Sequence, residues 1–168
     1  MEILTAVPDD TGEIYRIMTQ AGSDIKDRSW YLTDTEDYVR QHIGNRDKGI
    51  VFKAVEDGQI AAFFLIHLPG PEADNLGYYK KLDDSECLKV AYMDSMAVAP
   101  GFRGRGLQYA MMDRGGQYLT ATPYCHLMGT VHPDNIYSLG NFLKLGFEVV
   151  TTVRKYGGLP RHIMYKRI

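Results

Sequence analysis

The sequence is poor in cysteine and tryptophan, carries no large excess of either charge and has no long apolar run. Its two cysteines, Cys87 and Cys125, show neither metal-ligand spacing nor a pairing pattern, so we predict two reduced packing residues rather than a disulfide scaffold. The longest apolar run, Ile60 to Leu68, is broken by His67 and is far too short to span a bilayer, and Met1 to Leu4 lack a basic leader. The net charge of −2 gives no support for nucleic acid as a partner.

The composition that is present fits one globular domain. A chain of 168 residues with 45% hydrophobic content can bury a substantial core, so we expect a single domain over residues 1–168 without tail, linker or repeat. These features predict a cytoplasmic protein with no metal site and no membrane partner.

The stretch most informative about function lies in the middle of the chain. An apolar, β-prone run, Leu88 to Val98, leads into a glycine-rich turn, Pro100 to Gln108, and then into a helix-length segment, Gly106 to Leu119. The first N–H groups of a helix lack internal partners and the helix dipole adds partial positive charge there, so a phosphate is the natural ligand. Arg103 and Arg105 add formal charge to the turn. We interpret it as a cradle for a pyrophosphate.

Two common nucleotide-binding motifs are absent from this turn. It contains no G-x-x-x-x-G-K-[ST], which excludes a P-loop, and no G-x-G-x-x-G, which excludes the dinucleotide-binding fingerprint. The alternative for the turn alone is a tight connection in which Gly104 and Gly106 serve only the backbone and both arginines are exposed. A second segment further along the chain favours the ligand-binding interpretation.

The turn resembles motif A of the GNAT superfamily of N-acetyltransferases, [Q/R]-x-x-G-x-[G/A]. Arg103 and Gly106 match its first two fixed positions, whereas Gln108 stands where Gly or Ala is expected and either swings aside or adds an amide donor. Downstream, Asn135 to Phe147 resembles motif B of the same family, N-x-x-[AS]-x-x-[FL]-Y-x-x-x-G-F. The two motifs occur in the family's order and spacing, in a chain of suitable length.

The resemblance implies the fold class of that family, an α/β (layered α+β) fold. It has a central, mixed but mostly antiparallel twisted sheet of about seven strands, a splay between strands 4 and 5, and about four flanking helices. In the family, the fourth strand bulges and the pantetheine arm of acetyl-CoA pairs with its exposed backbone. The cofactor-binding residues that the resemblance implies here are Met96, Ala97, Val98, Arg103, Gly104, Arg105, Gly106, Leu107, Gln108, Asn135 and Phe142.

The resemblance also implies an acetyl-CoA-dependent N-acetyltransferase, in which a primary amine of a small molecule or peptide attacks the thioester directly. Alternation along the fourth strand puts Tyr92, Asp94 and Met96 on one face. From that face Asp94 can accept the proton of the amine, or it can serve as a structural hydrogen-bond acceptor. The Met96 N–H is our candidate for holding the thioester carbonyl.

One position departs from the family in a way that bears on turnover. The tyrosine that often protonates the leaving sulfur is replaced by Phe142, so we predict that Tyr137 or water substitutes for it. Because a thiol pKa is about 8.5, a lost general acid matters less here than it would for an alkoxide. The alternative function is a CoA- or acyl-CoA-binding sensor or regulatory module without turnover. The chain can be a monomer or a homodimer.

Periodicity and turn chemistry predict the elements of the first half. We expect helices from Pro8 to Gly22 and from Thr35 to Ile43, the second capped by Thr33 or Asp34. A hairpin of Ile50 to Val55 and Gln59 to His67 follows, joined at an Asp-Gly turn.

Two segments are expected near the acceptor. In a GNAT-like fold the connection from Ser23 to Tyr31 borders the acceptor pocket, and Trp30 either lines that pocket or acts as a staple for the second helix. Loops as long as that from Pro69 to Glu86 are commonly functional or mobile in compact domains. We expect this one to lie over the acceptor side. His67, at a strand end, is either a candidate catalyst or a hydrogen-bonded surface residue.

The last part of the chain is expected to be mainly structural. The helix of motif B starts at Asp134 or Asn135, stops at Gly146 and buries Ile136, Leu139 and Leu143. The glycine pair before it, Gly115-Gly116, indicates either close packing or a frayed helix end. Strands are predicted at Tyr124 to Val131, Phe147 to Val153 and His162 to Ile168, and we assign no function to the last two.

Overall fold

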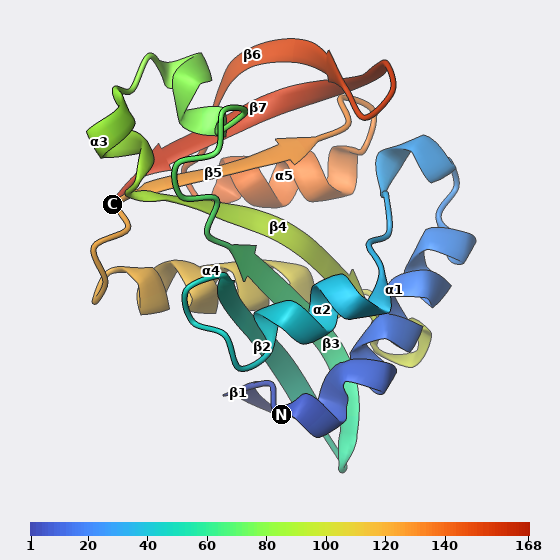
Figure 1. The fold of residues 1–168 in the computed structure, drawn as a ribbon. Coiled ribbons are helices and arrows are strands. Elements are labelled where there is room, and N and C mark those ends of the chain that lie inside the picture. Colours follow the sequence, from blue (N-terminus) through green and yellow to red (C-terminus); the bar gives the residue numbers. More distant parts are fainter.

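A seven-stranded sheet forms the centre of the computed structural model, which describes residues 1–168 (Figure 1). The strands lie in the order β1-β2-β3-β4-β5-β7-β6, and every neighbouring pair is antiparallel except β4 and β5, which are parallel. The predicted mixed, mostly antiparallel sheet is therefore confirmed. The strands are β1 (Glu2–Thr5), β2 (Gly49–Glu56), β3 (Gln59–His67), β4 (Val90–Val98), β5 (His126–Val131), β6 (Glu148–Lys155) and β7 (Leu159–Arg167).

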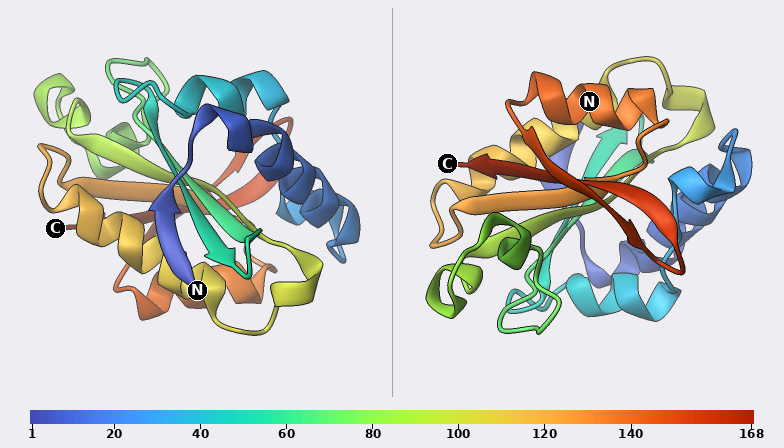
Figure 2. Two further views of the ribbon diagram at one scale, coloured as in Figure 1. Left: turned by 90° about the horizontal axis from the view of Figure 1, so that it is seen from below. Right: turned by 90° about the horizontal axis from the view of Figure 1, so that it is seen from above.

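Helices cover the sheet on both faces, as Figure 2 shows. One layer contains α1 and α2, and the opposite layer contains α4 and α5. None of the helices combines the length and the apolar character needed to cross a membrane. The α-helices are α1 (Thr11–Asp24), α2 (Glu36–His42), α3 (Asp84–Cys87), α4 (Leu107–Leu119) and α5 (Ile136–Lys144), and single turns of 3-10 helix lie at η1 (Pro8–Asp10), η2 (Arg28–Trp30), η3 (Leu76–Lys80) and η4 (Pro100–Phe102).

The strand β3 separates two hydrophobic clusters. Phe64 and Ile66 belong to the cluster under α4 and α5, whereas Phe63 and Leu65 belong to the cluster under α1 and α2. The nearly continuous apolar sequence of β3 follows from this position, because a strand covered on both faces has no solvent-facing side.

The sheet opens between β4 and β5. These strands pair only where Val90, Ala91 and Tyr92 face β5, and beyond Tyr92 they diverge (Figure 1). The predicted splay between the fourth and fifth strands is thus confirmed. The remaining residues of β4 keep their pairing with β3 on one edge only, so their other edge is available to a ligand.

A β-bulge at Asp94 accompanies the opening. Ser95 pairs with Leu65 and Met93 pairs with Ile66, so Asp94 has no partner on β3. Before the bulge Met93 faces the α4 cluster, and after it Met96 does so. The predicted common face for Tyr92, Asp94 and Met96 is therefore wrong, because one extra residue moves every later side chain to the opposite face.

Two helix predictions also need correction. The N-cap of α2 is Thr35, whose side chain accepts a hydrogen bond from the Tyr38 N–H at 3.1 Å, and not Thr33 or Asp34. In α5, Ile136 and Leu143 are 66% and 51% exposed instead of buried. The buried residue of that helix is Phe142, so its core face is rotated from the predicted one.

The ends of α5 agree with the sequence. The Asn135 side chain caps the helix by accepting from the Ser138 N–H at 3.2 Å. Gly146 follows the last turn with a positive φ of 84°, a conformation that glycine adopts without steric cost. Both cysteines, Cys87 and Cys125, are free thiols.

The glycine pair in α4 yields a matched stability test. A Cβ at Gly115 would lie 2.5 Å from Phe64 Cε1 and 3.0 Å from Ile66 Cδ1, whereas the nearest atom to a Cβ at Gly116 is Leu127 Cδ1 at 3.9 Å. We expect Gly115→Ala to lower the free energy of unfolding by about 1–3 kcal/mol through overpacking. Gly116→Ala should raise it by about 1 kcal/mol through helix propensity. Urea unfolding of both variants measures this, and equal shifts would contradict close packing at Gly115.

Candidate functional site

A cavity of about 830 Å³ lies in the opening of the sheet, between β4, α4 and α5, and we call it the large cavity. It brings together predicted site residues from three separate segments of the chain. Of the predicted cofactor and catalytic residues, only Arg105 is missing from its lining. The predicted residues that line it are Asp94, Met96, Ala97, Val98, Arg103, Gly104, Gly106, Leu107, Gln108, Asn135, Tyr137 and Phe142.

The turn before α4 presents a row of free backbone donors. None of the N–H groups from Gly104 to Tyr109 donates a hydrogen bond within the chain. Gly104 and Gly106 have positive φ values of 78° and 72°, and a Cβ at either position would meet no atom within 4 Å. Free N–H groups at a helix N-terminus, with open space in front of them, form an anion-binding site.

The two arginines of the turn have different surroundings. Arg103 lines the large cavity, where its Nη2 pairs with Asp24 at 2.9 Å and its Nε donates to the Val98 carbonyl at 3.2 Å. Arg105 instead pairs with Glu56 at 2.8 Å, and its guanidinium lies 5.3 Å from the ring centre of Phe102. The Arg105 side chain therefore points away from the cavity, and only its backbone N–H stays a candidate for anion binding.

Gln108, the position that departs from motif A, turns toward α5. Its Nε2 lies 3.4 Å from the Ser138 hydroxyl oxygen, and both residues line the large cavity. The structure thus agrees with the first alternative, in which the side chain turns aside from the row of N–H groups. Its amide group stays at the cavity wall.

The open edge of β4 supplies further backbone groups. The Ala99 N–H donates to the Ala61 carbonyl at 2.8 Å, so the backbone of this residue points toward β3. Because backbone direction alternates along an antiparallel strand, the groups of Met96 and Val98 point to the opposite edge, into the splay. The Val98 carbonyl accepts from Arg103, whereas the Met96 N–H faces the large cavity without a strand partner.

A second cavity, of about 460 Å³, adjoins the first on the α2 side of β4, and we call it the small cavity. Its walls come from η2, α2, the loop after β3 and the β6–β7 hairpin. Five residues line both cavities, so the two spaces meet at the bulge. They are Trp30, Tyr31, Met93, Asp94 and Thr130.

Both segments predicted near the acceptor contribute residues to the small cavity, although Asp24, Ile25 and Lys26 of the first line only the large one. Trp30 belongs to both cavity walls, and its buried indole N–H has no hydrogen-bond partner in the chain. The loop after β3 contributes Glu72, Asp74 and Leu76, although part of that loop is helical and not an open excursion. Tyr78 and Tyr79 of the same loop line neither cavity.

Asp94 stands where the cavities meet. The Tyr38 hydroxyl donates a hydrogen bond to its carboxylate at 3.0 Å, and Asp34 lines the same small cavity. Loss of hydration, followed by the neighbouring Asp34 charge, raises the pKa of Asp94 to about 7, with the Tyr38 hydrogen bond acting in the opposite direction. The surface that Asp94 exposes faces the two cavities and not the outside of the protein. The walls of these cavities restrict hydration of the carboxylate, so loss of hydration is the main cause of the raised pKa.

Two histidines lie behind Tyr38. His42 and His67 share a hydrogen bond of 2.8 Å between their ring nitrogens, and the other nitrogen of His42 is 2.8 Å from the Tyr38 carbonyl oxygen. Burial lowers the pKa of both rings, which favours the neutral forms. His67 lines the small cavity, and its hydrogen bond to His42 agrees with the predicted hydrogen-bonded residue.

The position of the replaced tyrosine is tightly packed. Phe142 is 3% exposed, and a Cβ at Gly129 would lie 2.8 Å from its Cζ. Its ring also meets Phe147 edge-on, with 5.0 Å between ring centres. Tyr137, by contrast, is 74% exposed, lines the large cavity and has no hydrogen-bond partner for its hydroxyl within the chain. The geometry therefore leaves Tyr137 available for the role that Phe142 cannot fill.

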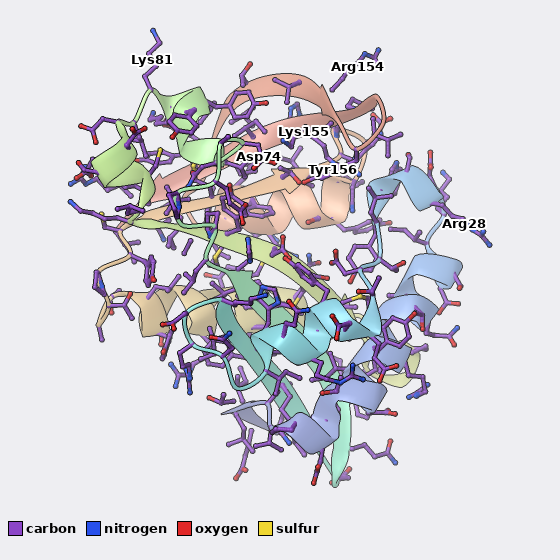
Figure 3. The ribbon with its side chains drawn as sticks, viewed as in Figure 1. Arg28, Asp74, Lys81, Arg154, Lys155 and Tyr156 are labelled. Atoms are coloured by element: carbon purple, nitrogen blue, oxygen red, sulfur yellow. The ribbon has the colours of Figure 1, made fainter.

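We predicted no function for the β6–β7 hairpin, but its residues form part of the small cavity. Lys155, Tyr156 and Arg161 all line the small cavity, whereas Arg154 points outward (Figure 3). Arg161 lies on the same face of β7 as the buried Ile163 and Tyr165. A charged residue in phase with an apolar face was the available signal, and the ordinary strand pattern around it hid that signal.

The sequence matches the acetyltransferase (GNAT) family over residues 11–147, a span that includes both motifs, the splayed strand and α1. The chain belongs to the GNAT family. The family assigned from the two motifs is thus confirmed, together with its fold. No curated protein sequence matches the chain.

Solved structures of GNAT proteins share the whole architecture. A ribosomal-protein-alanine N-acetyltransferase from Brucella melitensis superimposes with a TM-score of 0.77 at 19% identity, covering 100% of both chains. A ribosomal-protein-S18-alanine N-acetyltransferase from Escherichia coli gives 0.74 at 20% identity, covering 99% of this chain and 93% of the other. A phosphinothricin acetyltransferase from Sinorhizobium meliloti, solved in complex with acetyl-CoA, gives 0.73 at 15% identity over 99% and 88%. At such identities the likeness concerns the fold alone.

Proposed function

We propose that this GNAT protein transfers the acetyl group of acetyl-CoA to a primary amine of a small molecule or peptide, by direct attack of the amine on the thioester. One observation carries the proposal. The large and small cavities meet at Asp94, so a donor in one and an acceptor in the other would have their reacting atoms beside a carboxylate with a pKa of about 7.

The large cavity fits acetyl-CoA, which supplies the activated acetyl group. The free N–H groups from Gly104 to Tyr109 suit its diphosphate, and the open space at Gly104 and Gly106 allows close approach. The Met96 backbone suits the amides of the pantetheine arm, and Phe142 offers an apolar wall. The enzyme from Sinorhizobium meliloti, which has this fold, was solved with acetyl-CoA bound.

Asp94 addresses the first chemical difficulty, which is the charge of the amine. A lysine-like amine has a pKa of about 10.4, so exposing its lone pair at pH 7 costs roughly 4–5 kcal/mol. A base whose own pKa is close to the working pH removes that proton most effectively. Asp94 has this property because of its enclosure and the nearby Asp34, and Tyr38 fixes its orientation.

The attack forms a nitrogen–carbon bond and breaks the carbon–sulfur bond, and each charge that develops needs a partner. The Met96 N–H points into the splay and can donate to the carbonyl oxygen, a contact worth on the order of 3 kcal/mol in other acyl-transfer enzymes. The thiolate leaves without a strong acid, since its pKa is about 8.5. Tyr137 or a water molecule supplies the proton.

The test is release of free CoA thiol from acetyl-CoA in the presence of a panel of primary amines, with binding of CoA measured in parallel. We expect tight CoA binding and amine-dependent thiol release. Binding without release for every amine would favour the sensor or regulatory module, and absence of binding would refute the proposed use of the large cavity. Native mass spectrometry of freshly purified protein checks for co-purifying CoA or acetyl-CoA.

A further inference from the structure

Arg161 is a buried cation in the wall of the small cavity. Its relative exposure is only 3%, yet it lies among the residues that line this space. Arginine is almost never fully buried unless an anion accompanies it, because the charge loses its hydration. Burial also lowers the pKa of Arg161.

No carboxylate of the chain pairs with Arg161. It takes part in none of the ion pairs of the structure. Its Nη2 donates to the Ser29 carbonyl at 2.6 Å and its Nη1 donates to the Pro160 carbonyl at 2.8 Å. A guanidinium has five N–H donors, so the remaining ones, including that on Nε, have no acceptor in the chain.

The small cavity also has a negative pole. Asp34 and Asp94 line it on the α2 side, where an incoming ammonium group would find two carboxylates. Both poles belong to the wall of one cavity of about 460 Å³, and Tyr156 lines the same cavity with its ring centre 5.4 Å from the Arg161 guanidinium carbon. A ligand that fills this cavity therefore meets both an anionic and a cationic group.

We propose that the acceptor of this enzyme is an amino carboxylate, with its amino group at Asp94 and its carboxylate on the free N–H groups of Arg161. This inference rests on the proposed function and narrows it from any primary amine to one that also carries an anion. A guanidinium suits a carboxylate because its planar fork can donate two parallel hydrogen bonds. The buried charge of Arg161 would then be compensated only in the complex.

Two other acceptor classes fit less well. A polyamine would find Asp34, Glu72, Asp74 and Asp94 attractive, but it would meet Arg161 and Lys155 in the same cavity. The side chain of a protein lysine brings one ammonium group and no anion near it, so Arg161 would stay uncompensated. Both classes are included in the experiment as outcomes that overturn the proposal.

The first experiment compares amino acids with their own carboxamides. The panel consists of glycine, alanine, methionine, phenylalanine and glutamate, each beside its amide, with β-alanine and γ-aminobutyrate for longer spacings, spermidine as the polyamine and a lysine-containing peptide with blocked ends. We expect kcat/KM for the best amino acid to exceed that of its amide by about 100-fold or more, because the amide leaves Arg161 unpaired. Equal rates for acid and amide, or a preference for spermidine or the peptide, would overturn the proposal.

The second experiment removes the guanidinium. Arg161→Met should lower kcat/KM for the amino acid by about 100-fold and leave the rate with its amide nearly unchanged, while Arg161→Lys should give an intermediate loss. Arg154→Gln is the matched control, since Arg154 is exposed and points outward from the same hairpin (Figure 3). Equal losses for acid and amide would show that Arg161 serves only to hold the loop at Ser29.

A binding measurement separates this inference from the proposed function. Thermal unfolding with saturating CoA is followed as alanine or alaninamide is added. Greater protection by the amino acid, lost in Arg161→Met, supports the carboxylate site even if no thiol is released. If thiol release occurs but protection by acid and amide is the same in wild type and variant, the acyltransferase proposal stands and the carboxylate site fails.

Discussion

Replacing Gly106 by valine is expected to weaken CoA binding by more than about 100-fold. Gly106 precedes α4 with a φ of 72°, a conformation that costs a non-glycine residue about 1–2 kcal/mol and a β-branched one more. The added side chain would also occupy the open space in front of the free N–H groups. Hydrogen bonds from such groups to a charged acceptor contribute about 1.5–3 kcal/mol each, so losing even two accounts for the expected effect.

Isothermal titration with CoA measures the change, and thermal unfolding without CoA shows whether the variant folds. Gly12→Val is the matched control, because Gly12 is exposed in α1, has no positive φ, and a Cβ at this position would meet no atom within 4 Å. We expect the control to bind CoA like the wild type. Unchanged affinity in a folded Gly106→Val protein would show that the diphosphate is held elsewhere.

Replacing Asp94 by asparagine is expected to lower kcat by about 100- to 10,000-fold, the usual contribution of a general base. In the wild type, kcat should fall as the pH drops through about 7, because protonated Asp94 cannot accept the proton of the amine. The variant should lose this inflection while its affinity for CoA stays the same. A variant that retains the wild-type rate and pH profile would leave Asp94 with only a structural role.

Asp34→Asn is the companion variant. The Asp34 charge helps to raise the pKa of Asp94, so removing it should move the inflection to lower pH without abolishing turnover.

Stability gives a separate measurement of the pKa of Asp94. Since the folded-state pKa of Asp94 exceeds its ordinary value of 3.8, the folded protein binds more protons than the unfolded one between roughly pH 4 and 7, and stability falls as the pH rises through this window. The Tm advantage of Asp94→Asn should therefore grow across it and stay constant above pH 7.

The sequence predicted most of the fold because its strongest signals are local. The Asp-Gly turn, the apolar β3 and the Asn135 cap each depend on a few adjacent residues. The misplaced faces have a non-local cause. The bulge at Asp94 depends on the register of β4 against β3, and the rotation of α5 depends on how Phe142 fits over Gly129. Neither relation can be read from one segment of the chain.

The part of the candidate site that was predicted is local in the sequence, and the part that was missed is assembled from distant segments. The proposed anion cradle is a continuous stretch of chain, so its motif was visible in the sequence. The small cavity is assembled from η2, α2, the loop after β3 and the last hairpin, which are distant in sequence. Asp34, Tyr38 and Arg161 therefore escaped prediction, although Arg161 interrupts an apolar alternation that the surrounding strand obeys. Arg105 shows the opposite error, since its place in the motif hid its pairing with Glu56.

The short pairing between β4 and β5 divides the sheet into two parts that are joined only at one end. One part contains β1 to β4 and the other contains β5, β7 and β6, and the pairing at Val90, Ala91 and Tyr92 joins them. A molecule bound in the large cavity, between the two parts, would contact both of them and restrict their relative movement. A ligand in the gap would thus couple two parts of the sheet that only a short strand pairing joins, so we expect bound acetyl-CoA to stabilise the relative position of these parts.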